Sequence, residues 1–191
     1  MNKVPAERLF VSINLPDHIT ETVYCQGRDY FSNHRAIKQI PQKNVHITLK
    51  FLGDVQAARI DEVEQAIASS VAGIKTFNIE LDNRIDAFPA INKAGIIFIG
   101  VRQGAEDMEK IFTGLERNLD VLGFKPEKRK FVPHATIARI KKKMDIRRIA
   151  EKLNFKQFPV FKCDKIMLME SELKTTGAEY RIKREFGLKY F

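Results

Sequence analysis

The sequence predicts an α+β protein with a bilobal architecture, in which two similar halves are related by a pseudo-twofold axis. The main observation is a tripeptide that occurs twice, as His46-Ile47-Thr48 and as His134-Ala135-Thr136, 88 residues apart (134 − 46). Both copies lie in apolar, β-branched segments without helical spacing, which is typical of strands. A similar order of strand and helix precedes each copy, and the 191 residues are 44% apolar, which is enough for a core.

Each element of the first half follows from local signals. Pro16-Asp17 opens the first helix, Gly53-Asp54 ends the first tripeptide strand, and the second helix has apolar residues at every third or fourth position. In chain order we expect a strand at 8–15, a helix from 17 to about 31, the tripeptide strand at 45–52, a helix at 60–71 and a strand at 76–81.

The second half repeats this order after a loop rich in turn residues. Its main helix has a strongly apolar face and stops at Gly123. We expect the loop at 86–95, a strand at 96–101, the helix at 108–122, the second tripeptide strand at 132–138, a short helix at 145–153, and strands at 160–169 and 179–188.

The internal repeat extends beyond the tripeptides. A shift of 88 residues places the apolar residues of 9–13 on those of 97–101 and overlaps the helices that follow. We infer two strand-helix-strand lobes that face each other, each too small to be stable alone. Because no linker-like stretch separates them, residues 1–191 are expected to form a single bilobal domain.

The alternation of a strand predicts which side chains of the first tripeptide strand face a shared site. His46, Thr48 and Lys50 should project from one face, whereas Ile47, Leu49 and Phe51 should enter the core. Strict alternation sends Arg139, five residues after His134, to the opposite face. It reaches the site only if the strand bends, bulges or ends nearby, and otherwise belongs to an exposed basic run.

Two opposed histidines can supply the acid and the base that cleavage of a phosphodiester needs. With an ordinary pKa of about 6.5, one imidazole can be neutral while the other is protonated near neutral pH. Thr48 and Thr136 are placed to donate hydrogen bonds to phosphate oxygens, and Lys50 could add positive charge. His46 and His134 are therefore the candidate catalytic residues.

No metal or other cofactor is expected. His46 and His134 could bind a metal, but no third and fourth ligand with suitable spacing accompanies them. Cys25 and Cys163 are far apart and fit neither a zinc site nor a disulfide framework. A phosphate-binding Gly-rich loop and a Gly-x-Ser-x-Gly elbow are both missing from the sequence.

The charge distribution indicates a polyanionic partner. The net charge is +9, and residues 125–148 hold ten Lys and Arg against Glu127 and Asp145, so this stretch carries +8. Clustered cations around the second tripeptide favour nucleic acid, although such a run can also be a solvated loop. A non-catalytic RNA-binding module that uses the basic surface of 125–148 is the alternative function. No apolar run is long enough to span a bilayer, so we expect a cytoplasmic monomer that does not bind membranes.

These motifs resemble the RNA 2′,3′-cyclic phosphodiesterase family, also called the 2′-5′ RNA ligase family, of the two-histidine phosphoesterase superfamily. The likeness covers nearly the whole chain. Similar segments are the opening strand at 8–13, the two His-x-Thr motifs at 46–53 and 131–139, the dipeptide Phe88-Pro89 and the closing strands at 170–180.

The resemblance implies two antiparallel sheets that form a V-shaped cleft with helices on the outside. It also implies hydrolysis of RNA 2′,3′-cyclic phosphate ends, or of small cyclic nucleotides, to 2′-phosphomonoesters. His46 would be the proton donor to the departing 3′ oxygen, and His134 the proton acceptor that activates water. Thr48, Thr136 and Arg139 would hold the phosphate. The reverse reaction, with an RNA 5′-hydroxyl in place of water, would form a 2′-5′ linkage.

Overall fold

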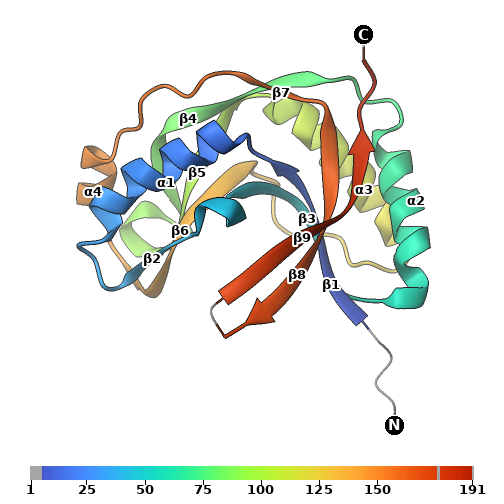
Figure 1. Cartoon of the computed structure of the whole chain (residues 1–191), viewed down its shortest axis with the longest axis horizontal. Coiled ribbons are helices and arrows are strands. Elements are labelled where there is room, and N and C mark those ends of the chain that lie inside the picture. The colour runs from blue at the N-terminus through green and yellow to red at the C-terminus, as the bar shows by residue number, and fades with distance from the viewer. Residues whose placement is uncertain (1–5, 176, 191) are drawn as a thin grey trace.

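The computed structural model of the protein describes residues 6–175 and 177–190 (Figure 1). The elements are, in order, β1 (Ala6–Asn14), α1 (Asp17–Phe31), β2 (Ile37–Gln39), β3 (His46–Gln56), α2 (Ile60–Val71), β4 (Phe77–Phe88), β5 (Ala94–Gln103), α3 (Ala105–Asp120), β6 (His134–Met144), α4 (Arg147–Lys152), β7 (Phe161–Cys163), β8 (Lys165–Lys174) and β9 (Gly177–Gly187).

The strands form one strongly curled antiparallel sheet that nearly divides in two. In the described residues the strand order is β7-β4-β5-β6-β3-β1-β8-β9, and β2 pairs with β6 outside this path. At the middle of this order, β3 and β6 meet through the single residue pair Ile47 and Ala135. The two sides diverge from that pair (Figure 1), so the predicted α+β class with antiparallel strands is confirmed, and the two predicted sheets are joined into one.

The two sides of the sheet are not the two halves of the chain. The His46 half consists of β3, β1, β8 and β9, and the His134 half of β6, β5, β4, β7 and β2. The helices also cross over, because α1 follows β1 but packs on β2 and β6, and α3 follows β5 but packs on β3. The predicted strand-helix-strand grouping therefore holds for the strand pairs β1–β3 and β5–β6, but not for the helices α1 and α3, which pack on the opposite side. The pseudo-twofold order of strands is built from interleaved segments.

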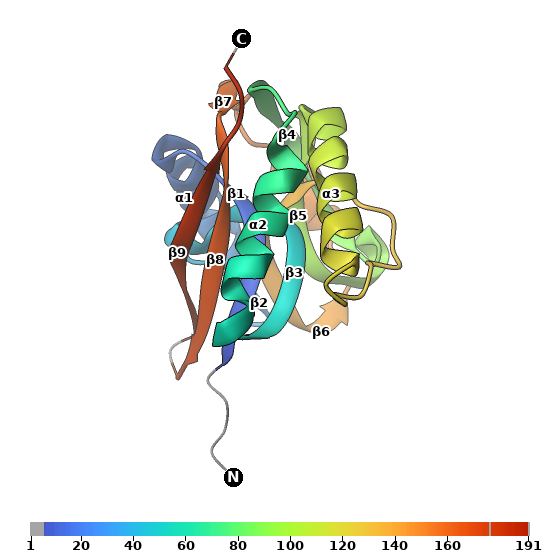
Figure 2. The ribbon, with the colours of Figure 1, turned by 90° about the vertical axis from the view of Figure 1, so that its right-hand side faces the viewer.

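The core lies on the face of the sheet that carries Ile47 and Ala135. Both residues are fully buried in one continuous cluster with apolar side chains of the helices, among them Ile67 of α2 and Ile111 of α3. The helices α2 and α3 lie side by side (Figure 2) and contact each other. This packing leaves the opposite face of β3 and β6, which carries the histidines, open to the cleft.

Gly53 continues a strand that we expected it to end. β3 runs to Gln56, and its register against β1 skips a residue between the pairs Leu9–Gly53 and Phe10–Phe51. Gly53 has a φ of +73°, a conformation that glycine adopts without steric cost. It therefore serves a β-bulge, a common position for glycine in a strand.

Other predicted boundaries are wrong because long-range strand pairing outweighs local turn signals. The expected loop at 86–95 is shorter, since β4 extends to Phe88 and β5 begins at Ala94. The expected strand at 160–169 is two strands, of which β7 pairs with β4 and β8 pairs with β1. The short strand β2 was not predicted.

Candidate active site

A bulge directly after Thr48 changes the direction of the side chains that follow in β3. The register against β1 skips one residue at Leu49. Leu49 and Lys50 are consequently both buried, and the Phe51 side chain is 69% exposed and lines the cleft. The prediction that Phe51 enters the core is wrong, because the bulge reverses the alternation.

β6 contains the equivalent bulge at Ile137, 88 residues after Leu49. The register against β5 skips this residue, and Ile137 and Ala138 are both buried. Arg139 is exposed and lines the same cleft as the two histidines. β6 therefore has a bulge of the kind that Arg139 needs in order to reach the site.

The flanking strands follow a slightly different offset from the tripeptides. Ser12 of β1 pairs with Thr48, and Phe98 of β5 pairs with Thr136, which gives an offset of 86 residues (98 − 12). The predicted match of 9–13 with 97–101 is therefore displaced by two residues. A displacement of two residues keeps the side chains on the same face of a strand, so a shift of 88 residues still places apolar residues on apolar residues.

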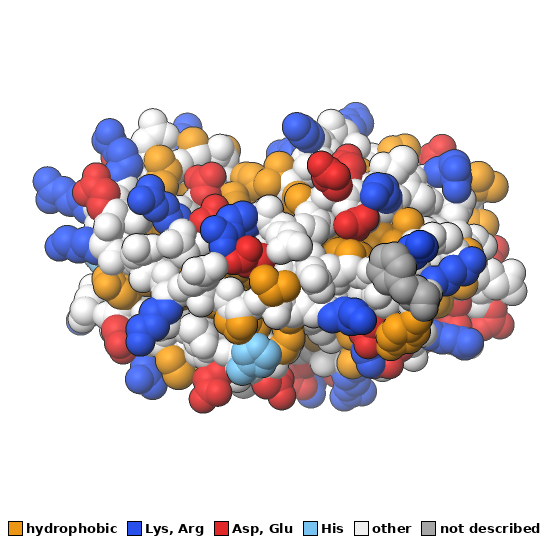
Figure 3. Space-filling model, turned by 90° about the horizontal axis from the view of Figure 1, so that it is seen from above, with side chains coloured by type: hydrophobic (Ala, Val, Ile, Leu, Met, Phe, Trp, Pro, Cys, Tyr) orange, Lys and Arg blue, Asp and Glu red, His pale blue; other side chains and the backbone are white. Residues whose placement is uncertain are grey.

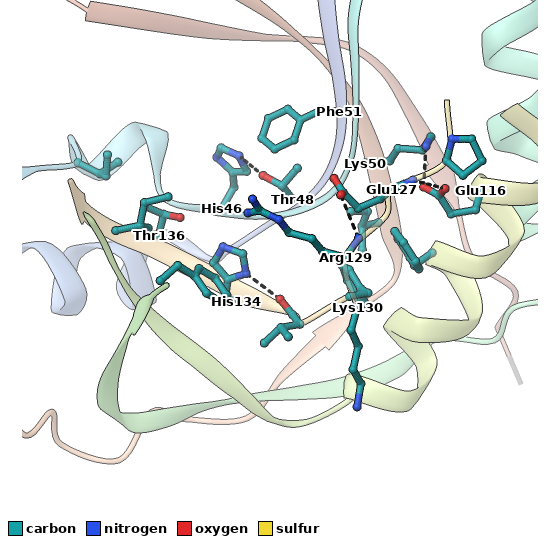
Figure 4. Close-up of a pocket in the computed structure, with 18 of the residues that line it drawn as sticks. His46, Thr48, Lys50, Phe51, Glu116, Glu127, Arg129, Lys130, His134 and Thr136 are labelled. Atoms are coloured by element: carbon teal, nitrogen blue, oxygen red, sulfur yellow. Dashed lines mark hydrogen bonds and ion pairs between the residues drawn. The ribbon is translucent and has the colours of Figure 1, made fainter. Parts of the chain in front are cut away.

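One cleft brings together all six predicted site residues. It has a volume of about 400 Å³, and its lining includes His46, Thr48, Lys50, His134, Thr136 and Arg139. Figure 4 shows the two imidazoles entering from β3 and β6. The volume is within the range of small-molecule sites.

The two imidazoles are oriented by the same backbone contact. Nδ1 of His46 lies 2.9 Å from the carbonyl oxygen of Asn44, and Nδ1 of His134 lies 2.7 Å from that of Val132. A carbonyl oxygen only accepts, so each Nδ1 donates a hydrogen and each neutral ring keeps Nε2 free of one. Nε2 of His46 is 3.0 Å from Oγ1 of Thr48, whose hydroxyl then donates to it.

Burial lowers the pKa of both histidines. His46 packs against Phe10 and Tyr180, with ring centroids 5.0 and 5.3 Å away, and its burial is the largest cause that lowers its pKa to about 4. The hydrogen bond to Asn44 opposes this shift, whereas the nearby charges of His134 and Arg139 add to it.

The pKa of His134 is also lowered, chiefly by burial beside the rings of Phe88 and Phe98, and its bond to Val132 opposes the shift. The expectation of ordinary pKa values does not hold, because both sites are desolvated. Both imidazoles are therefore mainly neutral at pH 7 in the free protein.

Lys50 is tied to α3 and does not present a free charge to the histidines. Its Nζ lies 2.6 Å from Oε1 of Glu116 and 3.3 Å from the carbonyl oxygen of Lys125. Lys50 is only 5% exposed. The expected role in charge stabilisation does not fit this arrangement, since Glu116 already neutralises the ammonium group.

Arg129 is a candidate that the sequence did not single out within the basic run. It lies in the loop between α3 and β6, and Figure 4 shows its side chain extending into the cleft between His46 and His134. Its position depends on the fold of this loop, for which the sequence carries no specific signal.

The basic stretch is not a single surface. Of its ten cations, those that line the cleft are Lys125, Arg129, Lys130 and Arg139. Lys141, Lys142 and Lys143 are exposed residues farther along β6, outside the cleft. On the face shown in Figure 3, cations and carboxylates are interspersed.

The described residues contain neither a candidate metal site nor a candidate membrane-spanning helix. Among residues 6–175 and 177–190, no group of three or more His, Cys, Asp and Glu could hold a metal ion. Cys25 is exposed and Cys163 buried, and neither forms a disulfide. In the same part of the chain, none of the helices has the length and apolar character needed to cross a bilayer.

Comparison with known proteins identifies the family. A model of the 2′-5′ RNA ligase superfamily matches residues 25–175. The chain belongs to this family. Relatives named RNA 2′,3′-cyclic phosphodiesterase include one from Methanocaldococcus jannaschii, 32% identical over 182 residues, which cover 94% of this chain and 99% of the relative. Another, from Methanothermobacter thermautotrophicus, is 27% identical over 188 residues, or 95% and 98% of the two chains.

Solved structures share the fold of the chain. The crystal structure of TT0787 from Thermus thermophilus has a TM-score of 0.78 at 23% identity and covers 95% of this chain and 97% of that one. Escherichia coli LigT complexed with 3′-AMP has a TM-score of 0.75 at 20% identity, with coverage of 97% and 99%.

Proposed function

We propose that the protein hydrolyses RNA 2′,3′-cyclic phosphate ends, and small nucleotides that carry the same group, to 2′-phosphomonoesters. The observation that carries the proposal is the pair of imidazoles in one cleft, each of which donates from Nδ1 to a carbonyl oxygen two residues earlier, so that Nε2 carries no hydrogen in the neutral ring. The names of the relatives, RNA 2′,3′-cyclic phosphodiesterase, support the same reaction.

In the proposed reaction the two histidines divide proton transfer between them. Nε2 of His134 accepts a proton from water as the water oxygen attacks phosphorus, and the bond from phosphorus to O3′ breaks. Protonated His46 donates its Nε2 proton to O3′. Loss of the proton from His134 to solvent and uptake of one by His46 restore the starting state.

Because the pKa of His46 is lowered in the free protein, protonation of His46 depends on bound substrate. Because His46 is mainly neutral in the free protein, it must gain a proton before it can donate one. The negative charge of the cyclic phosphate stabilises an imidazolium and raises the pKa of His46. Thr48, Thr136 and Arg139 are proposed to bind the non-bridging oxygens, which gain charge in the transition state.

The proposal needs no metal or other cofactor. The same histidines would catalyse 2′-5′ ligation in reverse if an RNA 5′-hydroxyl replaced water. A cytoplasmic monomer that folds as one domain is the corresponding expectation for the whole chain, and it stays a prediction.

The test is a product assay on RNA that ends in a 2′,3′-cyclic phosphate, with a chelator present. We expect a 2′-phosphate product, and near-complete loss of activity in His46→Ala and in His134→Ala. His18→Ala is the matched control, because His18 is exposed on α1 and does not line the cleft. Full activity in either active-site variant, or a 3′-phosphate product, would overturn the proposal. Salt-sensitive RNA binding without product would indicate the RNA-binding module instead.

A further inference from the structure

Two arginines in the cleft have no partner for their positive charge among the described residues. In the part of the chain that the structure describes, no hydrogen bond or ion pair involves the guanidinium group of Arg129 or of Arg139. By contrast, Arg59, Arg102 and Arg147 are each paired with a carboxylate. An unpaired arginine inside a cleft is available to an anionic ligand.

The two arginines enter the cleft from different directions. β3 and β6 run antiparallel from the pair Ile47–Ala135, so Arg139 on β6 and Phe51 on β3 lie in opposite directions from the histidines. The loop that carries Arg129 is anchored beside Phe51, because Lys50 donates to the carbonyl oxygen of Lys125. Figure 4 shows Arg129 entering from this side. Arg129 therefore reaches the space between the histidines from the side opposite to Arg139.

A chain of hydrogen bonds holds the backbone at Arg129. Glu116 binds Lys50 through Oε1 at 2.6 Å and accepts from the backbone N–H of Glu127 through Oε2 at 2.8 Å. Oε1 of Glu127 then accepts from the backbone N–H of Arg129 at 3.2 Å. Because this chain begins at a buried lysine, the loop is fixed to the body of the protein, which reduces the entropy lost when Arg129 binds a ligand.

The chemistry of the substrate suggests what Arg129 binds. A 2′,3′-cyclic mononucleotide has one phosphate, for which the proposed function uses Thr48, Thr136 and Arg139. An RNA end has a second phosphate on the 5′ oxygen of its last nucleotide. Resting on the proposed function, we propose that Arg129 binds this preceding phosphodiester, so that the cleft favours RNA of at least two nucleotides over a cyclic mononucleotide.

The experiment compares adenosine 2′,3′-cyclic phosphate with a dinucleotide that ends in the same cyclic nucleotide. We expect wild type to have the higher kcat/KM for the dinucleotide. Arg129→Ala should lower that value about tenfold to a hundredfold, as expected for loss of a hydrogen bond to a charged group, and leave the mononucleotide value unchanged. Arg129→Lys should retain part of the preference.

The neighbouring residue offers a matched control. Lys128 is exposed in the same loop but does not line the cleft, so Lys128→Ala should leave both substrates unaffected. The salt dependence gives a second readout, since Arg129→Ala should reduce the slope of log kcat/KM against log salt concentration for the dinucleotide by about one.

The outcomes separate this inference from the proposed function. An equal loss on both substrates would place Arg129 at the cyclic phosphate and overturn the inference, as would no loss on either. If wild type hydrolyses neither substrate, the proposed function fails, and equilibrium binding of the dinucleotide then tests Arg129 directly. Unchanged binding in Arg129→Ala would overturn the inference in that case also.

Discussion

The His46 half and the His134 half have nearly the same backbone around the histidine but differ in the residues beyond the bulge. Both rings donate to a carbonyl oxygen two residues earlier, and both strands bulge directly after the threonine. The fourth residue after histidine is the buried Lys50 in one half and Ala138 in the other. The fifth is Phe51 or Arg139, and both line the cleft. Duplication thus preserved the position of the imidazoles while the residues beside them diverged.

The two histidines also differ in how much the surroundings lower their pKa. His46 packs against Phe10 and Tyr180, and its pKa falls to about 4. The pKa of His134 is lowered by burial without a contribution from a neighbouring cation. In the free protein these shifts favour a neutral His134, as a base requires, but oppose a protonated His46, so the acid has to gain its proton when the anionic substrate is bound.

The largest expected effect is loss of either imidazole. His46→Ala and His134→Ala should each lower kcat about a hundredfold to ten-thousandfold, because each removes one proton-transfer group. Similar losses, measured by product formation at saturating substrate, would show that the two halves contribute equally. Loss in only one variant would show that one half alone carries the chemistry.

The buried ion pair of the His46 half has no counterpart beside Ala138 and should affect stability. The side chains of Lys50 and Glu116 are 3% and 16% exposed. Glu116→Gln should lower the free energy of unfolding by about 3–5 kcal/mol, because it leaves a buried ammonium group without its counter-charge. Urea denaturation measures this.

A surface ion pair serves as the control for that measurement. Glu62→Gln on α2 removes the carboxylate partner of Arg59, where both side chains are about 40% exposed, and should cost at most about 1 kcal/mol. Equal costs for the two variants would show that burial of Lys50 does not matter.

Replacement of the fifth residue after each histidine with alanine tests how the two halves differ in function. Arg139→Ala should lower kcat/KM about tenfold to a hundredfold, since it removes charged hydrogen bonds to the phosphate. Phe51→Ala should have a smaller effect, because no charge is lost. Steady-state kinetics on the same cyclic-phosphate RNA would contradict the proposed role of Arg139 if the order of the two effects were reversed.

The smallest expected effect concerns pH. Because the pKa of His46 is lowered, kcat/KM should rise as the pH falls from about 8 to below about 6.5, where more His46 is protonated, and fall again as His134 gains a proton. Bound anionic substrate raises the pKa of His46, so kcat should decline only at higher pH. Profiles of kcat and kcat/KM measure this, and a kcat/KM that keeps rising to about pH 8 would contradict the protonation states proposed for the free protein.

The sequence predicted the fold class, the main helices and the position of both tripeptides because these depend on local periodicity and on an internal repeat. It did not predict the two bulges, which depend on pairing with β1 and β5, and so it placed Phe51 in the core. It gave no partner for Lys50, because Glu116 is 66 residues away in the chain. The position of Arg129 depended on the same tertiary contacts.

A substrate with sulfur in place of the 3′ bridging oxygen tests the division of labour between the two halves most directly. A thiolate, with a pKa of about 8.5 for the thiol, leaves without the proton that an alkoxide needs. His46→Ala should regain most of the wild-type rate on this substrate, whereas His134→Ala should remain slow because water still has to be activated. Rescue of His134→Ala, or of neither variant, would contradict the assignment of His46 as acid and His134 as base.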